Sequence, residues 1–216
     1  MTETSLTSGR PTIELTPEMR ASLVVILANL VLAFIIYMAG GIDPGFLMRD
    51  VVSIAGLPAY TGAYGYVAVL LFAAGATIGI FSATALPPQT RHLRGLLVLG
   101  GAYAALACLD DLYLLHEKGF YLGLSEKKSL LIHVVLVGWL MLKTAAVWRD
   151  VPWPLFALTL VCMAASTTLD VAPPSFEGQG LAEEFFETTG AAFLAAFLAL
   201  TAHRALVRPD DRLQAP

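Results

Sequence analysis

Six apolar runs, each near the roughly 20 residues that a helix needs to cross a bilayer, constrain this chain more than any other feature. They cover residues 21–40, 64–86, 95–115, 129–148, 153–171 and 181–205. The runs are continuous rather than alternating, which favours helices over the strands of a β-barrel. Little chain remains for a soluble domain. The sequence therefore predicts an all-α integral membrane protein, with a single bundle of six transmembrane helices over residues 21–206.

The basic residues of the predicted loops indicate how this bundle is oriented. Nine Lys and Arg residues fall on the side of the N-terminus and four on the other side. Because basic loops stay in the cytoplasm, we expect both termini there, with residues 1–20 as a cytoplasmic segment and residues 207–216 as a cytoplasmic tail. Spans rich in Ala, Leu and Gly, joined by short loops, are typical of bacteria. The expected location is the bacterial cytoplasmic (inner) membrane, with the lipid bilayer as the main partner.

The acidic residues are distributed in the opposite way to the basic residues, with more of them on the outer side. Under the same topology, six of the 17 Asp and Glu residues lie on the cytoplasmic side and eleven on the outer side. The inner balance is then +3 and the outer balance −7, which together account for the net charge of −4. A negative outer face attracts cations and disfavours nucleic acid. We therefore expect no nucleic-acid partner.

Several of these acids fall inside or at the ends of the apolar runs. An aspartate near the centre of a transmembrane helix costs roughly 2.5–3.5 kcal/mol on insertion scales, so a chain that keeps several usually provides a metal, a proton or another cation for them. Four different spans bring such groups to a similar depth on the outer side. The candidate metal ligands are Asp110, Asp111, His116, Glu117, His133, Asp170, Glu183, Glu184 and Glu187.

Simpler explanations exist for some of these candidates. Glu183 and Glu184 suit the first turns of a helix, where the dipole and the caps favour acids. The candidates between residues 116 and 128 suit a hydrated loop. The aspartates of the third and fifth spans lie at C-terminal helix ends, where the dipole disfavours anions. Capping does not explain those aspartates, but a structural network with the lysines of the 116–128 loop does.

The ligand types indicate which chemistry the cluster supports. Two imidazoles, His116 and His133, with several carboxylates suit zinc, manganese or iron, whereas carboxylates alone suit calcium or magnesium. A metal ion there activates water for hydrolysis, with Asp111 and Glu187 as the candidate catalytic residues. The sequence therefore favours a metal-dependent membrane hydrolase acting on a lipid or another amphiphile. The spacing of Gly75 and Gly79 is typical of close helix packing within such a bundle.

Two alternatives stay open. The first is a non-catalytic accessory subunit of a larger membrane complex, which would have other membrane subunits as partners. The second is a proton- or cation-coupled carrier that uses the same carboxylates. The layout also resembles the membrane hydrolase superfamily of alkaline ceramidases and adiponectin receptors, which hold zinc with three histidines, an aspartate and a serine. Because this chain has no late pair of histidines and no seventh span, we do not assign it to that superfamily.

Overall fold

The computed structural model describes residues 63–113, 126–173 and 179–207, together with Leu27, Val31 and Gly56. The chain divides into two compact units, residues 1–61 and 62–216. In the first unit, Leu27 and Val31 are helical and exposed. The rest of the expected first span, residues 21–40, lies outside the described residues. The candidate site falls entirely in the second unit.

The described part of the second unit is all-helical. Its helices are α4 (Ala63–Ala85), α5 (Arg94–Tyr113), α7 (Glu126–Ala146), α8 (Trp153–Val171) and α9 (Gln179–Val207), with the 3-10 helix η1 (Pro88–Leu93) between α4 and α5. All five α-helices are long and apolar enough to cross a membrane. Their ends differ from the expected spans by no more than three residues. The all-helical, multi-pass character is thereby confirmed, while the count of six and the orientation stay predictions.

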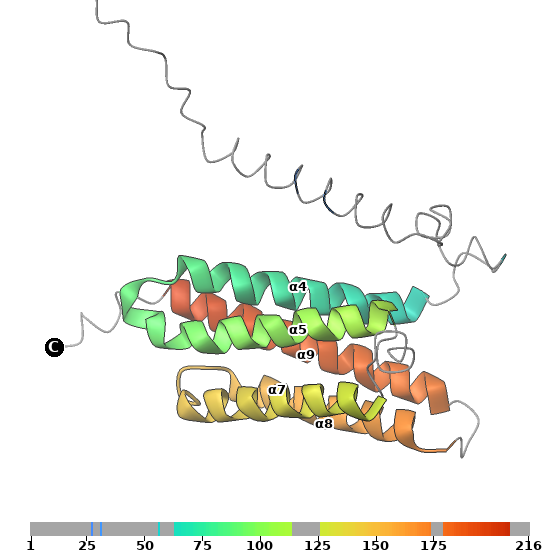
Figure 1. Cartoon of the computed structure of the whole chain (residues 1–216). Helices are drawn as coiled ribbons and strands as arrows, with labels where there is room; N and C mark the ends of the chain where they lie inside the picture. The colour runs from blue at the N-terminus through green and yellow to red at the C-terminus, as the bar shows by residue number, and fades with distance from the viewer. Residues whose placement is uncertain are drawn as a thin grey trace, which may run out of the picture. The chain divides into compact units, whose positions relative to one another are not determined.

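Three of the helices form the centre of this unit. Helices α4, α5 and α9 pack against one another, while α7 packs on α5 and α8 packs on α9. Figure 1 shows α4 and α9, the first and last of these helices in the sequence, lying side by side. The side chains with the least exposure come mainly from the three central helices, and they include Phe72, Leu97, Leu194, Phe197 and Leu198. Helices α7 and α8 are therefore peripheral elements around a close-packed core.

Glycines allow α4 and α5 to approach at backbone contact. A Cβ atom added to Gly79 would lie 2.8 Å from the Leu97 carbonyl oxygen and 3.0 Å from the Gly101 Cα. A Cβ atom at Gly101 would in turn lie 2.9 Å from the Ile80 nitrogen. Any larger side chain at either position would push the helices apart. The small-residue pattern of the second span thus serves packing within the bundle.

The chain directions bring the ends of α5 and α8 and the beginnings of α4, α7 and α9 to one end of the bundle. The junction between α8 and α9 is held by Gln179. Its side-chain amide donates hydrogen bonds to the carbonyl oxygens of Leu169 at 2.8 Å and Ala172 at 3.1 Å. These bonds satisfy carbonyls that the end of a helix leaves without a partner. They also hold Asp170 close to the first turns of α9.

Candidate functional site

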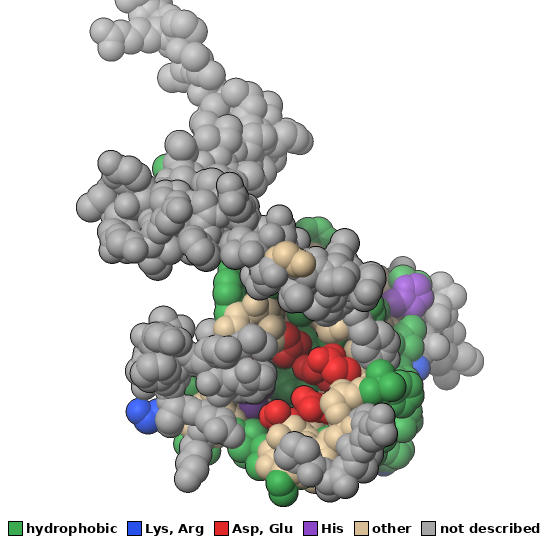
Figure 2. Space-filling view, turned by 90° about the vertical axis from the view of Figure 1, so that its right-hand side faces the viewer, with side chains coloured by type: hydrophobic (Ala, Val, Ile, Leu, Met, Phe, Trp, Pro, Cys, Tyr) green, Lys and Arg blue, Asp and Glu red, His purple; other side chains and the backbone are tan. Residues whose placement is uncertain are grey.

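A cavity of about 950 Å³ lies between the peripheral helices α7 and α8 and the central helices α5 and α9. We call it the acidic cavity, because five acidic residues and one histidine line it. These residues are Asp110 and Asp111 of α5, His133 of α7, Asp170 of α8, and Glu183 and Glu187 of α9. Figure 2, which looks onto this end of the bundle, shows acidic side chains gathered in a hollow. Six of the nine candidates from the sequence therefore converge on one cavity.

Their positions along the helices follow from the sequence spacing. Asp110 and Asp111 lie in the last turn of α5, and Asp170 is one residue before the end of α8. Glu183 and Glu187 are one turn apart, so they share a face of α9. Because α9 begins at Gln179, its first turn contains no acid. Helix-end stabilisation fades within the first turn, so it does not account for Glu183 and Glu187.

One close polar pair in the cavity joins α7 to α5. The His133 Nε2 lies 2.9 Å from the Asp110 Oδ2, and the two side chains are only 18% and 8% exposed. The ring nitrogen has no aligned hydrogen-bond acceptor among the described residues, so the contact is a close electrostatic approach rather than a directed hydrogen bond. The imidazole also makes a T-shaped contact with the ring of buried Tyr103, with ring centroids 5.9 Å apart. His133 of α7 thus lies between two side chains of α5, the acid Asp110 and the aromatic ring of Tyr103.

Glu184 lies elsewhere, although its neighbour Glu183 lines the cavity. Its carboxylate rests against Gly65 of α4, where a Cβ atom would come within 3.4 Å of the Glu184 Oε2. That oxygen is buried and has no hydrogen-bond partner among the described residues. Glu184 is absent from the lining of the acidic cavity. Adjacent acids of α9 therefore face different helices.

Two further candidates, His116 and Glu117, lie outside the described residues. Within the residues that the structure describes, no three His, Cys, Asp or Glu side chains form a group that could hold a metal ion. The expected divalent metal therefore stays a prediction.

The charged side chains that line the acidic cavity are all acidic in the part of the chain that the structure describes. None of the described residues that line it is Lys or Arg. Most of the remaining wall is apolar, with Leu130, Val134 and Val137 on α7 and Phe156 and Leu160 on α8. Charges on low-dielectric walls produce a strong local potential, because little water is present to screen them. The cavity therefore combines an apolar body with a negatively charged end.

Sequence reasoning missed the polar residues of α8 that line the same cavity. Thr159 and Ser166 are both buried, and together with Met163 and Asp170 they lie four, three and four residues apart. This spacing places all four on one helix face. A search for polar residues at helical spacing within the fifth span would have found this face. Tyr103 and Gly138 carry no such signal, because aromatic and small residues are common in transmembrane helices.

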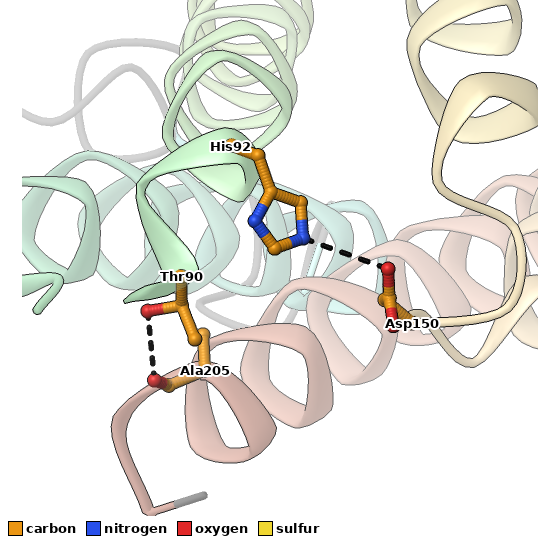
Figure 3. Close-up of polar contacts among 4 residues, drawn as sticks. All are labelled: Thr90, His92, Asp150 and Ala205. Carbon is orange, nitrogen blue, oxygen red and sulfur yellow. Dashed lines mark hydrogen bonds and ion pairs between the residues drawn. The ribbon is translucent and has the colours of Figure 1, made fainter. Parts of the chain in front are cut away.

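The opposite end of the bundle holds polar contacts of another kind, shown in Figure 3. There the Thr90 hydroxyl of η1 donates a hydrogen bond to the Ala205 carbonyl oxygen of α9 at 3.0 Å. The His92 Nε2 lies 3.5 Å from the Asp150 Oδ2, which joins η1 to the turn between α7 and α8. These contacts tie helix ends together, and none of the four residues lines the acidic cavity.

Comparison with known proteins identifies the family but no characterised relative. Neither the curated proteins nor the solved structures include a match to this chain. One family model covers residues 22–201, which is most of the sequence and includes every described residue of the acidic cavity. The chain belongs to the family described as "Domain of unknown function (DUF8692)".

Proposed function

We propose that this membrane protein binds an amphiphilic cation in the acidic cavity. The observation that carries the proposal is the composition of the lining: five acids and one histidine at one end, an otherwise largely apolar wall, and no Lys or Arg among the described lining residues. Ligand pockets are usually apolar, with a few polar groups that fix the orientation of the ligand. Here those groups attract a positively charged head group.

The layout of the cavity assigns a role to each part of such a ligand. Asp111, Asp170 and Glu187 neutralise the head group at the end where α5 and α8 terminate. Asp110 already lies 2.9 Å from His133, so it contributes less to the ligand. The hydrocarbon part lies against Val137, Phe156 and Leu160. A carboxylate that meets a cation in an apolar site is worth more than the same pair in water.

The test compares ligands of equal chain length and opposite charge. Protein in lipid nanodiscs is titrated calorimetrically with dodecyltrimethylammonium and with dodecyl sulfate, and the heat of titrating empty nanodiscs is subtracted. We expect saturable binding of the cation and none of the anion. Glu187→Gln should weaken cation binding by about tenfold or more, which corresponds to ~1.4 kcal/mol.

Glu184→Gln is the matched control, because it is the same change three residues away on a side chain that faces α4. It should leave the dissociation constant unchanged. Equal binding of both amphiphiles, or equal effects of the two Glu→Gln variants, would overturn the proposal.

A second candidate function is the metal-dependent hydrolase expected from the sequence. The 2.9 Å approach of His133 to Asp110 favours it, because Asp111 and Glu187 line the same cavity and supply further oxygen ligands. An imidazole with carboxylates suits zinc, manganese or iron. The described side chains do not form such a group as they stand, so binding of the ion must draw them together.

Metal analysis of protein purified without chelators tests this second candidate. This candidate predicts about one equivalent of zinc, manganese or iron per chain, as a single catalytic site requires. The double variant Asp111→Asn with His133→Ala should lose that metal, while Glu184→Gln should retain it. A wild-type protein that copurifies with no metal, and takes up none on dialysis against each ion, excludes the hydrolase candidate.

A further inference from the structure

A second cavity, of about 450 Å³, adjoins the acidic cavity. It is lined by Met141, Thr144, Ala145, Trp148, Trp153, Phe156, Ala157 and Leu160. Three of these residues, Met141, Phe156 and Leu160, also line the acidic cavity. The two cavities therefore adjoin at these side chains. We call the two cavities together, between the two peripheral helices, the α7–α8 groove.

The groove exists because α7 and α8 hardly touch. They are consecutive helices joined by the short turn at residues 147–152, yet α7 packs on α5 and α8 packs on α9. Along α8, the lining runs from Trp153 to Val171. At 1.5 Å per residue this corresponds to roughly 25 Å, close to the thickness of the hydrocarbon layer of a bilayer. One end of the groove carries acids and the other carries tryptophans.

The wall of the groove reaches the outer surface of the bundle. Met141, which lines both cavities, is 48% exposed, and Val134 is 59% exposed. Trp148 and Trp153, at the far end, are each about half exposed. Val134, Met141 and Trp153 belong to helices long enough and apolar enough to cross a membrane, and Trp148 lies in the turn that follows α7. In a bilayer, the exposed side of such helices faces hydrocarbon rather than water.

Gly138 marks free space inside the groove. It lines the acidic cavity in the middle of α7, and a Cβ atom added there would meet no atom within 4 Å. No close helix contact requires a glycine at this position, in contrast to Gly79 and Gly101. A larger side chain at Gly138 therefore extends into the groove without displacing a neighbouring helix.

We infer that a membrane amphiphile enters sideways from the bilayer between α7 and α8, and that its hydrocarbon chain lies in the α7–α8 groove with the chain end near Trp148 and Trp153. This inference rests on the proposed function and names the binding mode of the ligand. Charge complementarity fixes the direction, because the acidic end takes the cationic head. The tryptophan end lies near the opposite membrane interface, where such residues are common.

The experiment uses the position of the tryptophans. The chain has three, Trp139, Trp148 and Trp153, and Trp139 lines neither cavity. In a Trp139→Phe background, protein in nanodiscs is titrated with 18-bromooctadecyltrimethylammonium, whose chain is long enough to reach from the acidic end to the tryptophans. Its terminal bromine quenches nearby tryptophan fluorescence. We expect saturable quenching. Gly138→Phe should abolish the saturable part, and Gly138→Leu, as a second and smaller insertion, should weaken binding by about tenfold.

Gly95→Phe is the matched control, since a Cβ atom at Gly95 also meets nothing within 4 Å and the residue lines neither cavity. The brominated ligand should quench the tryptophan fluorescence of this variant as strongly as it quenches that of the background protein. Binding that is lost in Glu187→Gln but unchanged in both Gly138 variants would overturn the inference that the hydrocarbon chain lies in the groove. The proposed function would then still stand. A background protein without saturable quenching or heat would overturn the proposed function itself.

Discussion

His133 of α7 and Asp110 of α5 form a close contact between titratable side chains in the acidic cavity, with Nε2 and Oδ2 separated by 2.9 Å. The two residues are 23 positions apart in the sequence and lie on helices that pack against each other. Because α7 packs on the rest of the bundle mainly through α5, this pair is a polar link between a peripheral helix and the core. It therefore stabilises the wall of the cavity.

A double-mutant cycle measures this link. We expect Asp110→Asn and His133→Ala each to lower the free energy of unfolding by roughly 1–3 kcal/mol, because each leaves a buried polar partner behind. The double variant should lose less than the sum of the two, with a coupling energy above about 0.5 kcal/mol. Unfolding in mixed micelles, followed by circular dichroism, supplies the values. Strict additivity would mean that the two side chains do not interact.

The contact between α4 and α5 predicts a strict size limit at Gly79. We expect Gly79→Val to lower the free energy of unfolding by about 1–3 kcal/mol, because the added methyl groups meet backbone atoms of α5 that have no room to move. Thermal unfolding in detergent, followed by size-exclusion chromatography, detects this loss. Gly95→Val, made at a position with open space, should behave as the wild type. Equal stability of the two variants would contradict the backbone contact.

The opposite end of the bundle predicts a ranking of two substitutions. Thr90→Val removes a part-buried hydrogen bond to Ala205, so it should cost about 1 kcal/mol. His92→Ala removes a contact whose histidine side chain is 48% exposed, and such surface pairs contribute little. The His92→Ala variant should therefore unfold at a higher temperature than the Thr90→Val variant. The reverse order would indicate that the ion pair, and not the hydrogen bond, holds η1 in place.

Cysteine labelling tests the expected orientation. Pro173 lies at the acidic end and Gln89 at the opposite end, and both are exposed. In a chain whose native Cys108 and Cys162 are replaced by Ala, we expect a membrane-impermeant maleimide to label Pro173→Cys in intact cells and Gln89→Cys only after lysis. This follows from the excess of basic residues on the cytoplasmic side. Labelling of Gln89→Cys in intact cells would place the acidic cavity on the cytoplasmic side.

Much of the site was predictable because its ingredients are local in the sequence. The depth of Asp110, Asp111 and Asp170 follows from where an apolar run ends, and the pairing of Glu183 with Glu187 follows from helical spacing. The contact between His133 and Asp110 did not follow, since it depends on how α7 turns toward α5. Gly138 was not predictable either, because open space is a property of the surrounding helices and not of the glycine.

The sequence alone determined the helical class, the positions of five membrane-length helices and the gathering of acids at one end of the bundle, because hydrophobic length and residue spacing act within each helix. Only the tertiary structure decided which acids share a cavity. Glu183 and Glu184 are neighbours with the same chemistry, yet one lines the acidic cavity and the other rests on Gly65 of α4. The rotation of α9 makes that distinction, and this rotation is set by packing against α4 and α8, which no spacing within α9 records.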